Sequence, residues 1–455
     1  MPIATVNPCS GELVRKYEPH GEREVDQILN AAAAAQREWA LSSIGERAAA
    51  LSALAGRLRS RLEEYALLMT VEMGKPISQS RAEVEKCAAC VEYYVEHGEG
   101  FLADVSVATD AADSGYRHLP IGVILGVMPW NYPFWQALRF AIPTLLAGNG
   151  VVLKHASNVP GSALALEELM LDAGLPAGLF STVLLEGGAA VPLIHDPRIA
   201  GVSLTGSEAV GRLIGREAGA ALKPAVLELG GSDPFIVLED ADLGLAARAA
   251  ATARTLNNGQ TCIAAKRFIV ASSIHDEFVA LTIDALKALN VGDPSQDSTE
   301  LGPMARPDLR DELHAQLTQT VEAGGRLVLG GEIPDGGGAF YPASLMTEVQ
   351  PGMTGFDEEL FGPVGVVTKA SSDAQILELA NSSPYGLGAS IWSRDDAKAL
   401  ALGRRVETGM VFVNGFVRSD PRIPFGGVKA SGYGRELGQH GILAFVNTQT
   451  YWVAP

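Results

Sequence analysis

The spacing of apolar residues divides the chain into helical stretches and short strands. Between residues 24 and about 100, apolar positions recur three and four residues apart, as at Ile28, Ala32 and Trp39. This spacing places them on one face of a helix. Residues 101–120 are polar and interrupted by Gly and Pro. We therefore expect helices up to residue 100, followed by an extended segment.

From residue 121 to 229, short apolar runs alternate with helical patterns. The candidate strands are Val123–Met128, Val151–Lys154, Thr182–Leu185, Val202–Thr205 and Ala225–Leu229. Helical patterns separate several of them, notably at Ala163–Ala173 and Glu208–Ala221. Strands that alternate with helices predict a parallel sheet with crossover connections.

A second alternating series runs from about Pro234 to residue 430. Its candidate strands are Phe235–Leu238, Phe268–Val270, Val364–Thr368 and Val411–Asn414. The C-terminal stretch Val446–Val453 alternates Thr, Tyr and Val, which predicts one more strand. The pattern as a whole is that of an α/β protein.

Composition narrows the class of protein. A length of 455 residues predicts two or three domains, and 47% apolar residues suffice for sizeable cores. The net charge of −18 argues against nucleic-acid and anionic-membrane partners. No apolar run reaches the roughly 18 residues of a membrane helix, and residues 1–16 lack a signal-peptide core. Four cysteines make no disulfide framework. These features predict a cytoplasmic protein with reduced thiols.

Two motifs suggest a nucleophile and a base. Cys262 follows the loop sequence 257–261, Asn-Asn-Gly-Gln-Thr, and Glu228 lies between Leu227 and Leu229. An isolated cysteine is more often a small buried apolar residue. A loop thiol combined with a carboxylate in an apolar setting nevertheless favours covalent catalysis.

Two further motifs accompany them: Pro-Trp-Asn-Tyr-Pro at 129–133 and Glu-Leu-Phe-Gly-Pro at 359–363. Along the chain the four motifs follow the order found in the aldehyde dehydrogenase superfamily, which this sequence resembles from Asn7 to about Trp452. The resemblance implies an α/β fold with two parallel-sheet, Rossmann-like domains and a β oligomerisation arm. The implied division is an NAD(P)-binding domain at 1–100 and 121–229, a catalytic domain at 230–435, and an arm made of 101–120 and 436–455. A homodimer or homotetramer is also implied.

The resemblance implies the reaction of an aldehyde, NAD(P)⁺ and water to give an acid and NAD(P)H. Cys262 would attack the carbonyl, and the Asn131 amide with the Cys262 backbone N–H would stabilise the oxyanion. Glu228 would activate the water that hydrolyses the thioester, with a pKa raised by its apolar neighbours. Many relatives carry a Lys where this chain has Phe140, so a proton relay would use other groups, such as Glu436.

The cofactor site cannot rest on a Gly-x-Gly-x-x-Gly motif, because none occurs. The strand–helix junction at Gly206 and Ser207 would suit a phosphate, although an ordinary helix cap gives the same pattern. By resemblance, this junction faces the pyrophosphate. The other residues implied in cofactor binding are Trp130, Lys154, Ser157, Glu359 and Phe361. Ser157 replaces a Glu that is frequent in NAD-preferring relatives, which predicts that NADP is accepted as well as NAD.

Two positions indicate an aldehyde that bears a carboxylate. Arg139 and Ser419 match the residues that hold the distal carboxylate in succinate-semialdehyde dehydrogenases, and the chain most resembles the short bacterial type of those enzymes. An Arg fork is suited to binding carboxylates. The alternative for Arg139 is a structural ion pair. Arg418 and Arg422 are expected to be charges on the rim.

The alternatives are a dehydrogenase for another aldehyde, a catalytically inactive relative and a CoA-acylating enzyme. The substrate could be a different aldehyde, aromatic or amino-bearing. A catalytically inactive relative is disfavoured because Cys262, Glu228 and Asn131 are all present, and a CoA-acylating enzyme is disfavoured by Glu228. The Cys-x-x-Cys pair at 87–90 has no second pair and no His at metal-ligand spacing, so we expect no metal.

Overall fold

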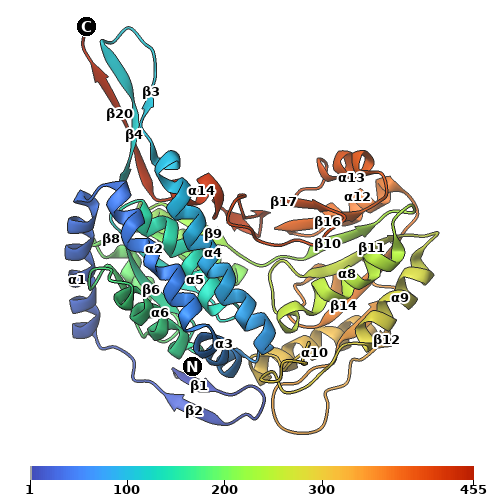
Figure 1. Ribbon diagram of the computed structural model, residues 1–455. Helices are drawn as coiled ribbons and strands as arrows, with labels where there is room; N and C mark the ends of the chain where they lie inside the picture. Colours follow the sequence, from blue (N-terminus) through green and yellow to red (C-terminus); the bar gives the residue numbers. More distant parts are fainter. Residues whose placement is uncertain (1–2) are drawn as a thin grey trace.

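The computed structural model describes residues 3–455 and has two lobes, each built around one sheet (Figure 1). The six-stranded sheet has the order β19-β9-β8-β5-β6-β7, and all neighbours are parallel except β19, which is antiparallel to β9. Its strands are β5 (Val123–Met128), β6 (Gly150–His155), β7 (Phe180–Thr182), β8 (Ile199–Thr205), β9 (Ala225–Glu228) and β19 (Gly432–Tyr433). The predicted parallel sheet is confirmed, although β7 begins and ends earlier than its apolar run suggested.

Helices pack around this sheet and include those expected up to about residue 100. They are α1 (Glu22–Leu41), α2 (Ile44–Ser60), α3 (Leu62–Met73), α4 (Ile77–Leu102), α5 (Pro133–Leu146), α6 (Pro160–Asp172), α7 (Glu208–Ala220) and α14 (Gly438–Leu443). Helix α5 packs against β5 and β6 as well as α4, and all of its residues are buried. It begins at Pro133, because proline fits the first helical position, where no N–H is needed.

The seven-stranded sheet of the other lobe has the order β12-β13-β14-β11-β10-β16-β17, parallel except for β12. Its strands are β10 (Asp233–Val237), β11 (Ala265–Ala271), β12 (Arg326–Leu329), β13 (Ser344–Thr347), β14 (Val364–Ala370), β16 (Gly388–Trp392) and β17 (Met410–Val413). Its helices are α8 (Leu243–Thr255), α9 (His275–Lys287), α10 (Pro307–Glu322), α11 (Thr354–Asp357), α12 (Asp373–Asn381) and α13 (Asp396–Gly403). The apolar pattern missed β13 and β16, which are fully buried yet contain Ser, Gly and Ala.

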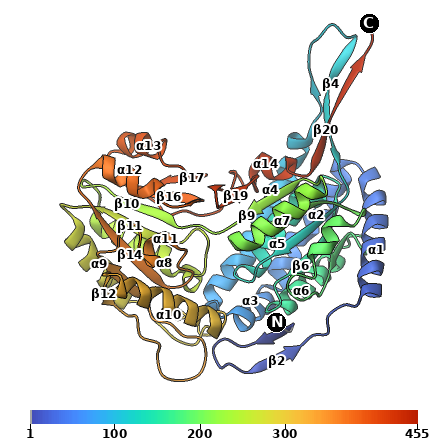
Figure 2. The same ribbon diagram turned by 180° about the vertical axis from the view of Figure 1, so that it is seen from behind.

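A three-stranded antiparallel ribbon projects away from both lobes and carries the C-terminus at its tip (Figures 1 and 2). It consists of β3 (Val105–Ser106), β4 (Asp113–Pro120) and β20 (Val446–Val453). The predicted extended segment and C-terminal strand are confirmed, except that residues 101 and 102 complete α4. Two small pairs, β1 (Ala4–Val6) with β2 (Leu13–Lys16) and β15 (Tyr385–Gly386) with β18 (Val428–Lys429), complete the strands. Within residues 3–455, no helix is long and apolar enough to cross a membrane.

The link between the lobes brings their edges together at one place. Strand β9 ends at Glu228, and the segment 229–232 leads directly into β10 of the other sheet (Figure 1). The chain later returns to the first sheet through β19, where Gly432 pairs with Glu228. The division into domains stays a prediction. Strand β19 belongs to the six-stranded sheet, although it lies within the range 230–435 that was expected to form the catalytic domain.

The pairing of β19 with β9 depends on a glycine. Gly432 has φ +109°, and a Cβ there would collide with the Leu227 carbonyl oxygen. We expect Gly432→Ala to cost on the order of 1–3 kcal/mol and to lower the thermal unfolding midpoint. Gly56→Ala is the matched control, since Gly56 lies within α2 and a Cβ there meets nothing within 4 Å. Unfolding midpoints that match in the two variants would contradict this role.

Candidate active site

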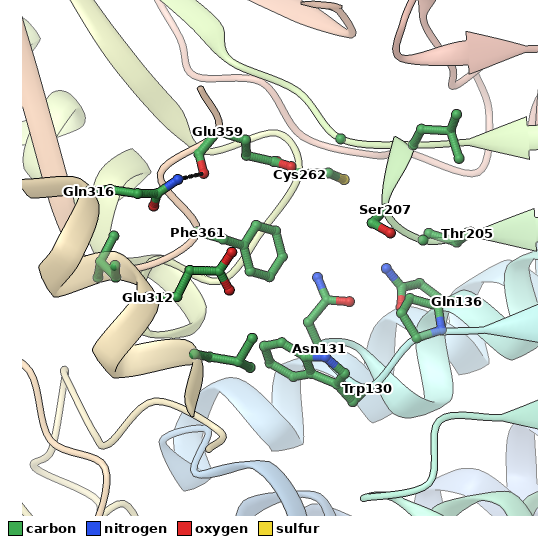
Figure 3. A pocket seen from close by; sticks show the side chains of 16 residues that line it. Trp130, Asn131, Gln136, Thr205, Ser207, Cys262, Glu312, Gln316, Glu359 and Phe361 are labelled. Atoms are coloured by element: carbon green, nitrogen blue, oxygen red, sulfur yellow. Dashed lines mark hydrogen bonds between the residues drawn. The ribbon is translucent and has the colours of Figure 1, made fainter. Parts of the chain in front are cut away.

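Cys262 lies between two cavities in the loop that joins the short helix η2 (Leu256–Gly259) to β11. The larger cavity has a volume of about 260 Å³ and is lined by Trp130, Asn131, Thr205, Gly206, Ser207, Glu312, Gln316, Glu359 and Phe361, among others (Figure 3). The smaller cavity, of about 80 Å³, is lined by Lys86, Tyr132, Trp135, Arg139, Phe416, Arg418, Ser419 and Phe425, among others. Cys262 and Gln136 line both.

The loop that presents the thiol is held in an uncommon backbone conformation. Asn257 and Asn258 both have φ +56°, and Gly259 follows with φ +73°. Asn tolerates this left-handed region better than most residues. The Asn258 amide also donates to the carbonyl oxygens of Gly74 and Pro303, at 2.8 Å each. These hydrogen bonds offset the strain and fix the loop against both lobes.

Burial raises the pKa of the Cys262 thiol to about 12, while the positive charges of Arg139 and Lys266 act in the opposite direction. The Lys266 ammonium donates to the Cys262 carbonyl oxygen at 2.7 Å. The resting thiol is therefore protonated at neutral pH. No acceptor within residues 3–455 takes the backbone N–H of Cys262, which leaves this donor free.

Asn131 brings a second donor to the same place. It is buried in the turn between β5 and α5, and its Nδ2 donates to the Gln260 carbonyl oxygen at 3.0 Å. Asn257 in turn donates to the Asn131 carbonyl oxygen at 2.7 Å. An amide nitrogen carries two hydrogens, so one remains. In Figure 3 the Asn131 side chain faces the same space as Cys262 and Phe361.

Glu228 and Glu436 are a pair of buried carboxyl groups. Burial, followed by the negative charge of Glu436, raises the pKa of Glu228 well above its usual range, as its apolar setting predicted. Neither oxygen of either side chain has a hydrogen-bond partner within residues 3–455. Glu228 lies against Gly426, where a Cβ would be 2.5 Å from Oε1. Its carboxyl group lines neither of the cavities beside Cys262.

Arg139 forms an ion pair and also lines the smaller cavity. Its Nε lies 2.5 Å from Glu436 Oε2, although that N–H does not point at the oxygen. Its Nη2 donates to Thr205 Oγ1 at 3.2 Å, and its guanidinium lies 4.7 Å from the centre of the Phe425 ring. The structural ion pair, which was the alternative role for Arg139 in the sequence analysis, is therefore present. Phe140, the next residue, packs against Gly126 of β5.

The larger cavity has features that suit a dinucleotide. Ser207 is the N-cap residue of α7, but its hydroxyl makes no capping hydrogen bond and faces the cavity (Figure 3). Helix N-termini at the carboxyl edge of a parallel sheet bind phosphates. Across the cavity, the rings of Trp130 and Phe361 lie edge to face, with their centres 5.8 Å apart. The Glu359 carboxylate is held by Lys266 at 3.0 Å. These groups fit the expected cofactor.

Lys154 and Ser157 do not line this cavity. Both lie at the carboxyl end of β6, which is the neighbour of β5. Lys154 is buried, and its burial lowers its pKa. The Ser157 carbonyl oxygen accepts a hydrogen bond from the Ala4 N–H at 3.1 Å. Their roles in binding a cofactor stay predictions, as do those of the other site residues.

The sequence analysis overlooked Lys86, Trp135, Gln136 and Lys266. Gln136 could have been noticed, because it interrupts a helix that is otherwise almost wholly apolar. Nothing in the sequence distinguishes Lys86 from the many other charged residues of α4. Cys87 and Cys90 are free, buried thiols on α4, and residues 3–455 contain no cluster of ligands able to hold a metal ion.

Comparison with known proteins identifies the family to which this chain belongs. The aldehyde dehydrogenase family model matches residues 1–451, and the chain belongs to this family. It is 48% identical to a probable succinate-semialdehyde dehydrogenase [NADP(+)] of Synechocystis sp. over the full length of both chains. It is 46% identical to the succinate semialdehyde dehydrogenase [NAD(P)+] Sad of Escherichia coli K12, over 98% of this chain and 97% of that protein.

Among solved structures, the succinic semialdehyde dehydrogenase of Streptococcus pyogenes in complex with NADP+ superimposes with a TM-score of 0.97. The two chains are 36% identical, and the match covers all of both. The predicted family and the two-sheet α/β fold are confirmed.

The raised pKa of the thiol can be measured by alkylation. We expect the iodoacetamide reaction of Cys262, in protein without cofactor, to accelerate about tenfold per pH unit between about pH 7 and pH 9, because only the thiolate reacts. Peptide mass spectrometry would follow Cys262, with the partly exposed Cys9 of the same digest for comparison. A rate that has already levelled off at neutral pH would show that the resting thiol is ionised.

Proposed function

We propose that this protein oxidises succinate semialdehyde to succinate with NADP or NAD as the cofactor. The observation that carries the proposal is the position of Cys262 between a larger cavity suited to a dinucleotide and a small cavity whose wall bears Lys86 and Arg139. The named relatives, similar over their full length, support the same substrate and cofactors.

In this proposal Cys262 is the nucleophile. After the thiol has lost its proton to solvent water, the thiolate attacks the aldehyde carbon, and the oxyanion accepts hydrogen bonds from the Asn131 amide and the Cys262 backbone N–H. Loss of one such donor typically slows acyl transfer by about 10²–10³. After oxidation of the adduct, Cys262 carries the succinyl group as a thioester.

The cofactor would be held along the carboxyl edge of the six-stranded sheet. Gly206 and Ser207 would bind the pyrophosphate, Lys154 the adenosine ribose, and Glu359 the nicotinamide ribose beside Trp130 and Phe361. When bound, NAD(P)⁺ supplies the hydride acceptor. Ser157 carries no charge that would repel a 2′-phosphate, so NADP is accepted as well as NAD.

Glu228 acts in the second half of the reaction. As a base it removes a proton from water, the oxygen attacks the thioester, and the Cys262 sulfur leaves as thiolate. Its side chain must first turn from Gly426 toward the cavity. In a position farther from Glu436, its pKa would no longer be raised by that negative charge.

The alternative substrates fit the smaller cavity less well. An aromatic aldehyde without a carboxylate would leave Lys86, on the wall of this cavity, without a counter-ion. The positive groups on its wall would repel an amino-aldehyde. An inactive relative would have no need to retain Cys262, Asn131 and Glu228 in these positions.

A homodimer or homotetramer built through the arm belongs to the same proposal. Within residues 3–455, β20 pairs only with β4, and Trp452 and Val453 remain more than half exposed at its end. A free strand edge with exposed apolar side chains favours pairing with a second copy. A cytoplasmic location and the absence of nucleic-acid and membrane partners stay predictions from composition.

Turnover of a substrate pair tests the proposal. With NADP or NAD, kcat/KM should be at least about tenfold higher for succinate semialdehyde than for butanal, since a buried carboxylate contact contributes more than 1.4 kcal/mol. NAD(P)H absorbance gives both rates. Cys262→Ala should abolish both while cofactor still binds, as measured by calorimetry. A preference for butanal would refute the substrate, and turnover by Cys262→Ala would refute the nucleophile.

The step assigned to Glu228 can be separated from the earlier chemistry. Glu228→Gln should keep a rapid burst of NAD(P)H, equal to the number of active sites, and lose steady-state turnover, because only thioester hydrolysis needs the base. Stopped-flow absorbance resolves the two phases. Glu322→Gln, at an exposed position near the end of α10, is the control. Loss of the burst itself would place Glu228 in the attack step instead.

A further inference from the structure

Lys86 has an ammonium group that faces the smaller cavity without a counter-ion. It lies on α4 and lines the cavity together with Cys262. Its Nζ donates to Ser419 Oγ at 2.6 Å and lies 4.3 Å from the centre of the Trp135 ring. Within residues 3–455 it forms no ion pair. A partly buried charge without a partner is costly unless a ligand supplies one.

The Ser419 hydroxyl is oriented by the same contacts. Its oxygen accepts hydrogen bonds from Lys86 Nζ at 2.6 Å and from Trp135 Nε1 at 3.1 Å. A hydroxyl oxygen has two acceptor positions and one hydrogen to donate. Both acceptor positions are therefore filled, and the Ser419 proton is left to donate to another group. An ammonium and a free hydroxyl proton at one spot form a site for an anion.

Two other cations line this wall: Arg418, which is exposed to solvent, and Arg139, which has a counter-ion. Its charge is balanced by Glu436, and one of its N–H groups donates to Thr205. Lys86 has no such balance. Burial, followed by the charge of Arg139, lowers the pKa of Lys86 to about 8, although the charge of Glu83 acts in the opposite direction. A carboxylate that enters the cavity would supply a counter-ion to the Lys86 ammonium.

We propose that Lys86, together with the Ser419 hydroxyl, binds the distal carboxylate of the substrate, and that Trp135 orients both groups. This proposal rests on the proposed function and adds a specificity-determining residue to it. Arg139 then acts mainly on the Glu436 side of the cavity and contributes to substrate binding through its long-range charge.

The test uses Lys86→Met, which keeps most of the side-chain stem beside Trp135 and removes the charge. For succinate semialdehyde, kcat/KM should fall by roughly 10²-fold or more, mostly through KM, because a charged hydrogen bond to the bound substrate is lost. For 4-oxobutanamide, which has a neutral amide of nearly the same size, kcat/KM should change by less than about threefold, since no charge contact is lost. Competitive inhibition by succinate should weaken in parallel.

Three controls accompany the variant. Lys287→Met makes the same substitution at an exposed position at the end of α9 and should leave all rates unchanged. Lys86→Arg keeps the charge and should retain part of the preference for succinate semialdehyde over the amide. Thermal unfolding of each variant shows whether the fold is intact.

The outcomes separate this inference from the proposed function. If the parent enzyme prefers 4-oxobutanamide and butanal, the succinate-semialdehyde assignment itself fails. If the parent prefers succinate semialdehyde but Lys86→Met keeps that preference, Lys86 is not the carboxylate ligand. A preference that survives Lys86→Met and is lost in Arg139→Ala would assign the carboxylate to Arg139, and an equal fall for both substrates would give Lys86 a structural role only.

Discussion

One buried carboxylate holds the start of the helix that forms the site. Glu83 on α4 accepts the backbone N–H groups of Phe134 and Trp135, at 2.9 Å each, and pairs with the buried Lys75. The first N–H groups of a helix have no partner within it, and a negative charge there is favourable. Glu83 therefore fixes both the position and the direction of α5.

By fixing α5, Glu83 also fixes the backbone of residues that line both cavities. The turn before α5 carries Asn131, and its first turns carry Trp135, Gln136 and Arg139 in succession. Because α5 packs against both the sheet and α4, the backbone that carries these side chains cannot shift without disturbing the sheet. The oxyanion donor Asn131, the cavity-lining side chains of α5 and the buried Arg139 are therefore all positioned by the same helix. Catalysis depends on such precise positioning.

The chemical motifs were more predictable from the sequence than the charge balance around them. The loop before Cys262, the carboxylate Glu228 and the Asn131 turn are local sequences, and strands rich in branched residues, such as β5 and β11, follow from their pattern. Strand β16 did not, because its Gly, Ala and Ser are buried by neighbouring strands, not by their own hydrophobicity. The contact between Lys86 and Ser419 joins positions 333 residues apart, and no local pattern encodes it.

Lys86 and Arg139 divide two tasks between them in the smaller cavity. Glu228 and Glu436 lie close together. Burial raises the pKa of both carboxyl groups, and the negative charge of Glu436 raises that of Glu228 further. The charge of Arg139 lowers the pKa of both, and Arg435 also lowers that of Glu228. If Arg139 also had to bind the substrate carboxylate, three acidic groups would share one guanidinium, and the pKa of the base would rise further. A separate ammonium for the substrate leaves the balance at Glu228 undisturbed when the substrate enters. Recognition of the carboxylate and control of the base can then be set by different residues in one small cavity.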